Sequence, residues 1–290
     1  MISLKNAIKI CALLLAAALV FCGCEQPGDT SSAVSDPVTG EPEDLSVYCF
    51  KAGAADAFLL YCKAGTVLID CGEKGFGKTV LNYLEKQGID RIDCLIITHF
   101  DKDHVGGAAK IINNTEIGEV LQSNAPKDSG EYGNYQEALG KAGIAAKTLT
   151  EKYYFSLGGV RFEVDPPKQS AYKSDESNNS SLIVSVFNGD DALLFCGDAE
   201  TERITEFFGA DTRKYGFIKI PHHGREEKLM EKLISTVCPK YAVITSSDEE
   251  PEAESVMNAL RNANVEVFLT RVAPVLIKSD GKQMTARYAE

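Results

Sequence analysis

The 290-residue chain has no tryptophan and only four histidines, and its basic residues are outnumbered by its acidic ones. It carries 30 lysines and arginines against 42 aspartates and glutamates, a formal net charge of −12 at pH 7. A general nucleic-acid coat protein needs a basic surface, so the sequence excludes that class but not a local basic groove. With 44% apolar and 25% charged residues, the chain has the composition of a folded protein that buries a sizeable core.

The apolar run near the N-terminus is too short to span a bilayer. Residues 10–21 form this 12-residue run after Lys5 and Lys9, a pattern typical of a signal-peptide core. The run leads into Gly23-Cys24, which resembles a bacterial lipobox. We therefore expect residues 1–24 to be a lipoprotein-type signal peptide and the mature protein to be exported. A lipid on Cys24 would anchor it at the outer face of the cytoplasmic membrane. An ordinary cleaved signal with an incidental cysteine is the alternative.

The composition changes after the leader. Residues 25–44 contain three prolines and many serine, threonine and acidic residues, so we expect a disordered tether. Residues 45–290 are expected to form one folded domain, as a monomer. None of the nine cysteines forms a CxxC pair, which excludes zinc-ribbon and thioredoxin-type sites. Cys62, Cys71, Cys94 and Cys196 lie in apolar runs and are predicted to be buried, although an exported protein could oxidise the six that follow the leader.

The folded part alternates short apolar runs with helical patterns, which predicts an α/β fold. Residues 93–98 (DCLIIT) read as a strand buried on both faces. Single helices are expected over residues 105–112 and 226–236.

All four histidines follow apolar strands. His99 and His104 flank Asp101 and Asp103 directly after residues 93–98, and His222-His223 follow the strand at 217–220. A third strand ends in Gly197-Asp198. A strand end holds its exit loop rigidly, and imidazole and carboxylate are metal ligands. This clustering predicts a preorganised metal site.

In this order, residues 98–107 (THFDKDHVGG), 197–199 (GDA) and 221–224 (PHHG) resemble the metallo-β-lactamase superfamily. More narrowly they resemble the hydrolase domain of ComEC-type competence proteins and their stand-alone relatives. Asp101 stands where the superfamily usually has a second histidine, and residues 178–182 (NNSSL) match a segment of the ComEC-like branch. Asp56 matches an acid near the start of that branch's domain. The resemblance implies a four-layer αββα sandwich.

The resemblance also implies two divalent cations, Zn²⁺ or Mn²⁺, and a phosphodiesterase-type reaction in which a metal-bound hydroxide attacks. The implied metal ligands are His99, Asp101, Asp103, His104, Asp198, His222 and His223. His99 and Asp101 would hold one cation, Asp103 and His104 would hold the other, and Asp198 would bridge the two cations. Only one of the two adjacent histidines would be a ligand, and the sequence does not decide which. Catalytic roles are implied for Asp103, His222, His223 and Asn178. Because no histidine fills the third motif, one tightly bound metal is the alternative to two.

The expected partner is a phosphate-containing substrate, either DNA or a small phosphodiester. Six basic residues around residues 221–224 would suit it: Arg213, Lys214, Lys219, Arg225, Lys228 and Lys232. Two other functions stay open. One is a non-catalytic metal- or substrate-binding lipoprotein. The other is a phosphate-binding loop at residues 72–79 (GEKGFGKT), whose spacing fits nucleotide-binding proteins.

Overall fold

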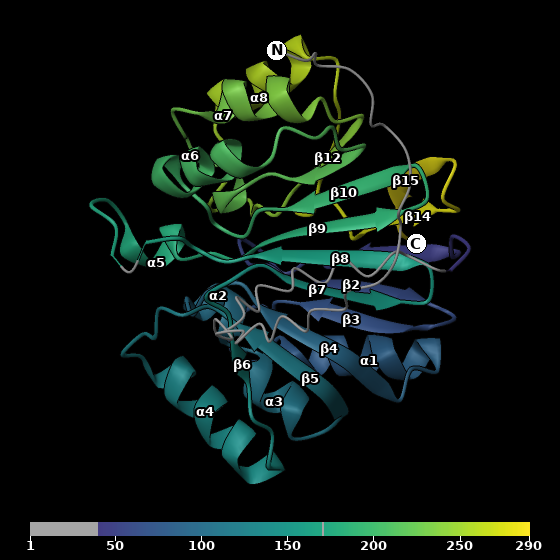
Figure 1. Ribbon diagram of the computed structural model, residues 1–290, viewed down its shortest axis with the longest axis vertical. Helices are drawn as coiled ribbons and strands as arrows, with labels where there is room; N and C mark the ends of the chain where they lie inside the picture. The colour runs from purple at the N-terminus through teal and green to yellow at the C-terminus, as the bar shows by residue number, and fades with distance from the viewer. Residues whose placement is uncertain (1–39, 170) are drawn as a thin grey trace, which may run out of the picture. The chain divides into compact units, whose positions relative to one another are not determined.

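The computed structural model describes residues 40–169 and 171–290 and contains two β-sheets that pack face to face between outer helices (Figure 1). This arrangement confirms the predicted αββα sandwich. The predicted signal peptide, residues 1–24, and residues 25–39 of the predicted tether lie outside the described residues. Among the helices that the structure describes, none is long and apolar enough to cross a membrane.

The first sheet has eight strands in the order β15-β14-β1-β2-β3-β4-β5-β6, and the run from β3 to β6 is parallel. Its strands are β1 (Leu45–Cys49), β2 (Phe58–Cys62), β3 (Gly65–Ile69), β4 (Arg91–Ile97), β5 (Glu116–Gln122), β6 (Lys147–Thr148), β14 (Val275–Ser279) and β15 (Met284–Tyr288).

The second sheet has seven strands in the order β13-β12-β11-β10-β9-β8-β7, and the run from β10 to β13 is parallel. Its strands are β7 (Tyr153–Leu157), β8 (Val160–Asp165), β9 (Ile183–Asn188), β10 (Asp191–Phe195), β11 (Phe217–Lys219), β12 (Tyr241–Ile244) and β13 (Glu266–Leu269).

The longer helices lie on the outer faces of the sheets (Figure 1). The first sheet is covered by α1 (Gly77–Gln87), α3 (Ala108–Ile112) and α4 (Gly130–Ala142). The second is covered by α6 (Thr201–Ala210), α7 (Met230–Val237) and α8 (Glu254–Asn262). Three short helices, α2 (Lys102–Val105), α5 (Glu176–Asn179) and η1 (His222–Gly224), include five of the candidate functional residues, whereas His99, Asp101 and Asp198 lie in the loops between elements.

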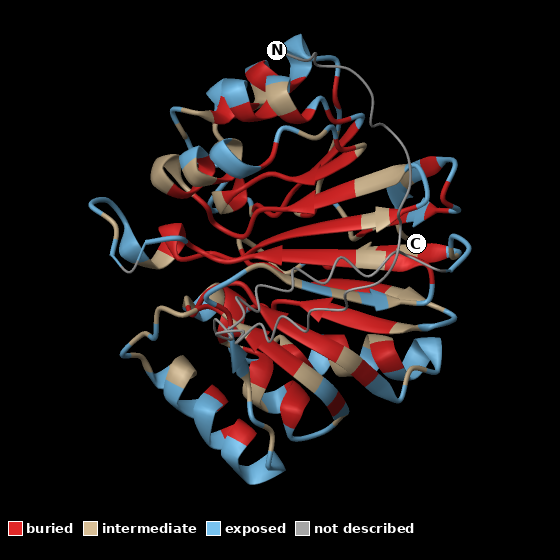
Figure 2. Cartoon of the chain, viewed as in Figure 1, coloured by how far each residue is buried: buried red, intermediate tan, exposed pale blue. Residues whose placement is uncertain are grey.

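Side chains along the central strands alternate between two cores. Cys94 and Ile96 of β4 face the second sheet, whereas Leu95 and Ile97 pack under the helices of the first. Successive residues of a strand point to opposite faces, so a strand covered on both sides is apolar throughout. The predicted strand at residues 93–98 is therefore correctly placed between two packed layers. Figure 2 shows the strands as largely buried and the outer faces of the helices as exposed.

Two predicted helices differ from the structure. The helix predicted over residues 105–112 is split into α2 and α3 at Gly106-Gly107. A Cβ atom on Gly106 would lie 2.5 Å from the amide nitrogen of Lys74, and one on Gly107 would lie 2.2 Å from the carbonyl oxygen of Cys71. This close approach to the β3–α1 loop needs glycine and interrupts the helix. The other predicted helix, over residues 226–236, begins only at Met230.

The six cysteines that the structure describes are all free. Cys71, Cys94 and Cys196 are buried as predicted. The prediction for Cys62 is wrong, because this residue is the last of β2 and is only half-buried.

Candidate metal centre

Three connections that follow parallel strands carry the candidate metal ligands. β4 leads through Thr98 into His99 and α2, β10 leads into Asp198, and β11 leads into η1. Because the carboxyl ends of parallel strands meet at one edge of a sheet, each sheet presents its loops at a common edge. The two sheets thus bring together residues more than one hundred positions apart in the sequence.

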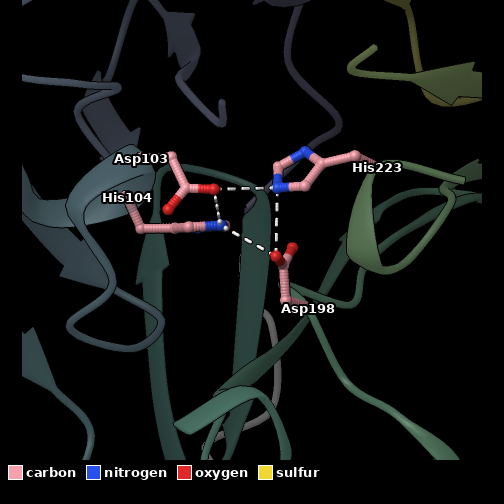
Figure 3. Close-up of side chains that lie close together, drawn as sticks. All are labelled: Asp103, His104, Asp198 and His223. Carbon is pink, nitrogen blue, oxygen red and sulfur yellow. Dashed lines mark hydrogen bonds and ion pairs between the residues drawn. The ribbon is translucent and has the colours of Figure 1, made fainter. Parts of the chain in front are cut away.

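Four side chains from these connections converge: Asp103, His104, Asp198 and His223 (Figure 3). One ligand atom from each lies within 4.8 Å of the others. His223 Nε2 is 3.0 Å from Asp198 Oδ2 and 3.2 Å from Asp103 Oδ2. His104 Nε2 is 3.2 Å from Asp198 Oδ2 and 3.9 Å from Asp103 Oδ2. Two imidazole nitrogens and two carboxylates thus surround one point.

This set fits a divalent cation. Metal–ligand bonds of about 2.0–2.1 Å in a tetrahedron place ligand atoms about 3.3–3.4 Å apart, within the range of the separations found here. In addition, His104 Nε2 is fully buried and makes no well-aligned hydrogen bond, although Asp198 Oδ2 lies 3.2 Å away. A buried polar nitrogen left unpaired is costly unless a ligand satisfies it. The imidazole and carboxylate donors, together with a buried His104 Nε2 that lacks a well-aligned hydrogen bond, are typical of a metal site.

The other nitrogen of His104 is held by Asp70, at the end of β3. Asp70 Oδ2 lies 2.8 Å from His104 Nδ1. The same carboxylate accepts hydrogen bonds from the backbone N–H of Thr98 at 2.8 Å and from its hydroxyl at 2.7 Å. A carboxylate on Nδ1 keeps the proton there and directs the Nε2 lone pair towards a metal. Asp70 is therefore the residue that orients His104.

His223 is oriented in a similar way by the second sheet. Its Nδ1 lies 3.0 Å from both the carbonyl oxygen and the hydroxyl oxygen of Thr245, which follows β12. The Thr245 hydroxyl donates to Asp56 Oδ1 at 2.6 Å. The ordered contacts on Nδ1 leave Nε2 facing the two candidate carboxylate ligands.

Lys219 neutralises the carboxylates behind the cluster. Its ammonium is buried, 2.6 Å from Asp56 Oδ2 and 3.2 Å from Asp198 Oδ1, and it donates to the Gly197 carbonyl oxygen at 2.9 Å. Asp198 thus has one oxygen fixed by a cation and the other free to face the cluster. A buried carboxylate without such a partner would be costly.

The protonation states follow from these contacts. Burial alone would lower the pKa of both histidines, but facing carboxylates raise the pKa of His104 well above its ordinary value and that of His223 to about 9. Burial would raise the pKa of Asp198 and Asp103, but the neighbouring histidines outweigh it and lower the pKa of both carboxyls. The carboxylates of the cluster therefore favour a positive charge between them, and either protons on the histidines or a bound metal ion can supply it.

His99 and Asp101 lie beside this cluster but outside it. The His99 ring centroid is 4.0 Å from that of His104. Burial, followed by the charge of His104, lowers the pKa of His99 to about 4, so its imidazole is neutral. Its Nε2 is buried without a hydrogen-bond partner and lies 3.9 Å from Asp101 Oδ1. Asp101 itself is bound by Lys127 Nζ at 2.5 Å and by the Ser177 hydroxyl. These two residues offer donors for a second cation, but a lysine already contacts one of them.

The structure separates the two adjacent histidines. Both have left-handed backbone angles, with φ of 47° at His222 and 52° at His223, and this turn places His223 inside and His222 at the half-exposed rim. His222 Nδ1 lies 3.1 Å from Glu200 Oε1, and its Nε2 lies 3.4 Å from Asn178 Nδ2. Asn178 also donates to Glu200 at 3.0 Å. His222 and Asn178 therefore form a polar rim with Glu200, whereas His223 faces the other candidate ligands.

Several residues of the site gave no separate signal in the sequence. Asp70 and Thr245 follow strands as the predicted ligands do, so their position could have suggested them. Lys219 was predicted only as part of a basic cluster, Glu200 directly follows the motif at residues 197–199 without belonging to it, and Lys127 lies in a segment without a recognisable motif.

A family model described as the metallo-beta-lactamase superfamily matches residues 51–245, more than half of the chain and all the candidate ligands. The chain belongs to the metallo-beta-lactamase superfamily. The resemblance stated from the strand-end motifs is thereby confirmed.

Curated relatives of this metallo-beta-lactamase chain include competence proteins, which supports the ComEC-like resemblance. It is 25% identical to ComE operon protein 3 of Bacillus subtilis over 201 residues, 67% of this chain and 25% of that protein. It is 28% identical to Recombination protein 2 of Haemophilus influenzae over 204 residues, 69% of this chain and 24% of that protein. The chain thus spans about a quarter of the length of these relatives.

A solved structure gives the same fold. The metallo-beta-lactamase fold protein YhfI from Bacillus subtilis aligns with a TM-score of 0.55 at 9% identity, covering 84% of this chain and 100% of that chain. At this identity the likeness concerns the fold alone.

The loop of residues 72–79 is the β3–α1 connection of the metallo-beta-lactamase domain rather than an open phosphate cradle. Gly77, the first residue of α1, is buried, and a Cβ atom on it would lie 2.6 Å from the carbonyl oxygen of Gly107. Gly72 accepts a hydrogen bond from the Gly107 amide at 3.0 Å. This packing braces the loop that carries Asp103 and His104, which argues against the nucleotide-binding alternative.

Proposed function

We propose that the protein is an exported metal-dependent hydrolase that cleaves phosphodiester bonds, in DNA or in a small phosphodiester. The observation that carries the proposal is the convergence of Asp103, His104, Asp198 and His223 around one point, where His104 Nε2 is buried without a well-aligned hydrogen bond. The fold is that of metal-dependent hydrolases. A divalent cation bound there would act as a Lewis acid and activate water near neutral pH.

The residues around the candidate metal centre would bind the cations or position the residues that bind them. Asp103, His104, Asp198 and His223 would hold the tightly bound cation, and Asp70 and Lys219 would fix the geometry of two of them. His99 and Asp101 would hold a second cation, either Zn²⁺ or Mn²⁺, when one binds.

His222 and Asn178 would contact the substrate from the rim. His222 and Asn178 would exchange their present contacts with Glu200 and with each other for hydrogen bonds to phosphoryl oxygens, which would position the scissile bond.

The phosphodiester assignment is supported by the relatives, one of which is named a recombination protein. The predicted basic cluster does not support it. Lys219 is buried against Asp56 and Asp198, Arg213 pairs with Glu163 and Asp211, and Arg225 pairs with Glu250. A small phosphodiester or a single strand end would need less basic surface than long duplex DNA.

A comparison of substrates tests this function. The metal-free full-length protein is assayed with Mn²⁺ or Zn²⁺ on bis-p-nitrophenyl phosphate, p-nitrophenyl phosphate, a chromogenic cephalosporin and a labelled DNA oligonucleotide. We expect metal-dependent cleavage of the diester, at least about 100-fold lower in Asp198→Asn, because this variant loses a ligand charge. Cephalosporin cleavage without diester cleavage would refute the substrate assignment. Metal binding without any turnover would favour the non-catalytic binding lipoprotein.

Location is a separate proposal that rests on the leader alone. We propose cleavage before Cys24, lipidation of that cysteine and a monomer on the outer face of the cytoplasmic membrane. Radiolabelled palmitate should be incorporated into the wild type and not into Cys24→Ser when each is expressed in a lipoprotein-processing bacterium. Equal labelling would contradict the proposal.

A further inference from the structure

Lys127 is the one basic residue on the described part of the chain that contacts the His99–Asp101 pair. It follows β5, and its ammonium lies 2.5 Å from Asp101 Oδ1 and 3.3 Å from the Ser177 hydroxyl. Ser177 also donates to the same Asp101 oxygen. Asp101 Oδ1 also lies 3.9 Å from His99 Nε2. The lysine thus contacts the oxygen that a second metal would need.

The charges around the site differ between its two halves. The half with Asp103 and Asp198 has the carboxylates of Asp56 and Asp70 behind it, and among the described residues Lys219 is its one lysine counter-ion, so four carboxylates face a single ammonium and the two histidines. The half with Asp101 has one carboxylate and one ammonium, which balance each other.

We propose that Lys127 is the built-in counter-ion of the second metal position, so that the protein binds one divalent cation tightly and admits a second only when Lys127 leaves Asp101. This inference rests on the proposed metal-dependent function. A second cation at His99 and Asp101 would meet an ammonium at close range, and like charges at such distances repel strongly in a partly buried site. Because the Lys127 side chain is 39% exposed, it can swing into solvent at modest cost.

The test measures metal occupancy rather than activity. Full-length wild-type protein and variants are freed of metal with a chelator, checked for folding by circular dichroism, and titrated with Mn²⁺ and Zn²⁺ by equilibrium dialysis and elemental analysis. Lys127→Met removes the charge and Lys127→Arg keeps it. Lys102→Met is the matched control, because Lys102 is exposed on the neighbouring helix α2 and lies 3.9 Å from Glu73.

We expect the wild type to bind one equivalent tightly and a second far more weakly. Lys127→Met should tighten the second step by about tenfold or more. Lys127→Arg and Lys102→Met should behave like the wild type.

Two equal tight steps in the wild type, or an unchanged second step in Lys127→Met, would overturn the role of Lys127 and leave the hydrolase standing. If the second binding step is unchanged in Lys127→Met and the KM of this variant for bis-p-nitrophenyl phosphate is raised, Lys127 would be assigned to substrate binding instead. No metal binding by any of these proteins would overturn the proposed function together with this inference.

Discussion

Replacing Asp70 by Asn removes the group that orients His104 while keeping its shape. Asp70 accepts three hydrogen bonds at 2.7–2.8 Å, two from Thr98 and one from His104 Nδ1. An amide can keep the bond from the Thr98 backbone through its oxygen. Its NH₂ group then lies near His104 Nδ1, where it donates and no longer accepts.

The expected consequence is a change of tautomer in His104. A donor on Nδ1 favours the proton on Nε2, the nitrogen that faces Asp198 and Asp103. Loss of a carboxylate behind a metal-bound histidine typically weakens metal binding 10–100-fold, about 1.4–2.7 kcal/mol. We therefore expect Asp70→Asn to raise the metal dissociation constant by this factor.

Isothermal titration of the metal-free protein with Zn²⁺ measures this constant directly. Asp90→Asn, a change of the same kind at an exposed position, serves as the control and should bind as the wild type does. Unfolding in urea with chelator present separates a loss of fold from a loss of affinity. Wild-type affinity in a folded Asp70→Asn protein would refute the assigned role of Asp70.

Three further outcomes follow from the same site. The metal-free protein holds a proton on His223, whose pKa is about 9, and the pKa of His104 is raised as well. Metal affinity should therefore rise at least about tenfold per pH unit below pH 9, and titrations in buffers of different ionisation enthalpy should detect at least one proton released per metal at pH 7. A pH-independent affinity between pH 6 and 8 would contradict this. Lys219→Met removes the ammonium that pairs with two buried carboxylates and should cost about 3–5 kcal/mol of unfolding free energy in urea with chelator; a loss below about 1 kcal/mol would contradict the ion pairs. Gly107→Ala places a methyl group 2.2 Å from the backbone oxygen of Cys71, so both metal affinity and thermal stability should fall, and an unchanged melting temperature would argue against that close packing.

The positions of the candidate ligands could be predicted because they depend on local rules. His99, His104 and Asp198 follow strands whose apolar runs are visible in the sequence, and parallel strands bring such ends to one edge. The four-layer fold was implied by the family resemblance and is confirmed. The same reasoning could not choose between His222 and His223, because that choice depends on two left-handed backbone angles.

The supporting residues were harder to predict because their partners come from distant segments. Lys219 reads as a surface cation in the sequence, yet it is buried against Asp56, 163 positions earlier in the chain by residue number. Lys127 lies in an irregular loop, and only the packing of α5 against that loop reveals its contact with Asp101 and Ser177. The break between α2 and α3 likewise depends on contact with the β3–α1 loop. Long-range contacts of this kind leave no periodic pattern.

Anomalous scattering from crystals of the protein grown with Mn²⁺ or Zn²⁺ tests the central claim most directly. We predict a strong anomalous peak among Asp103, His104, Asp198 and His223, about 2.0–2.2 Å from the Nε2 atoms of both histidines. A second peak at His99 and Asp101 should be weaker or absent at low metal concentration. A fully bound metal elsewhere, with no peak among these four side chains, would contradict the account.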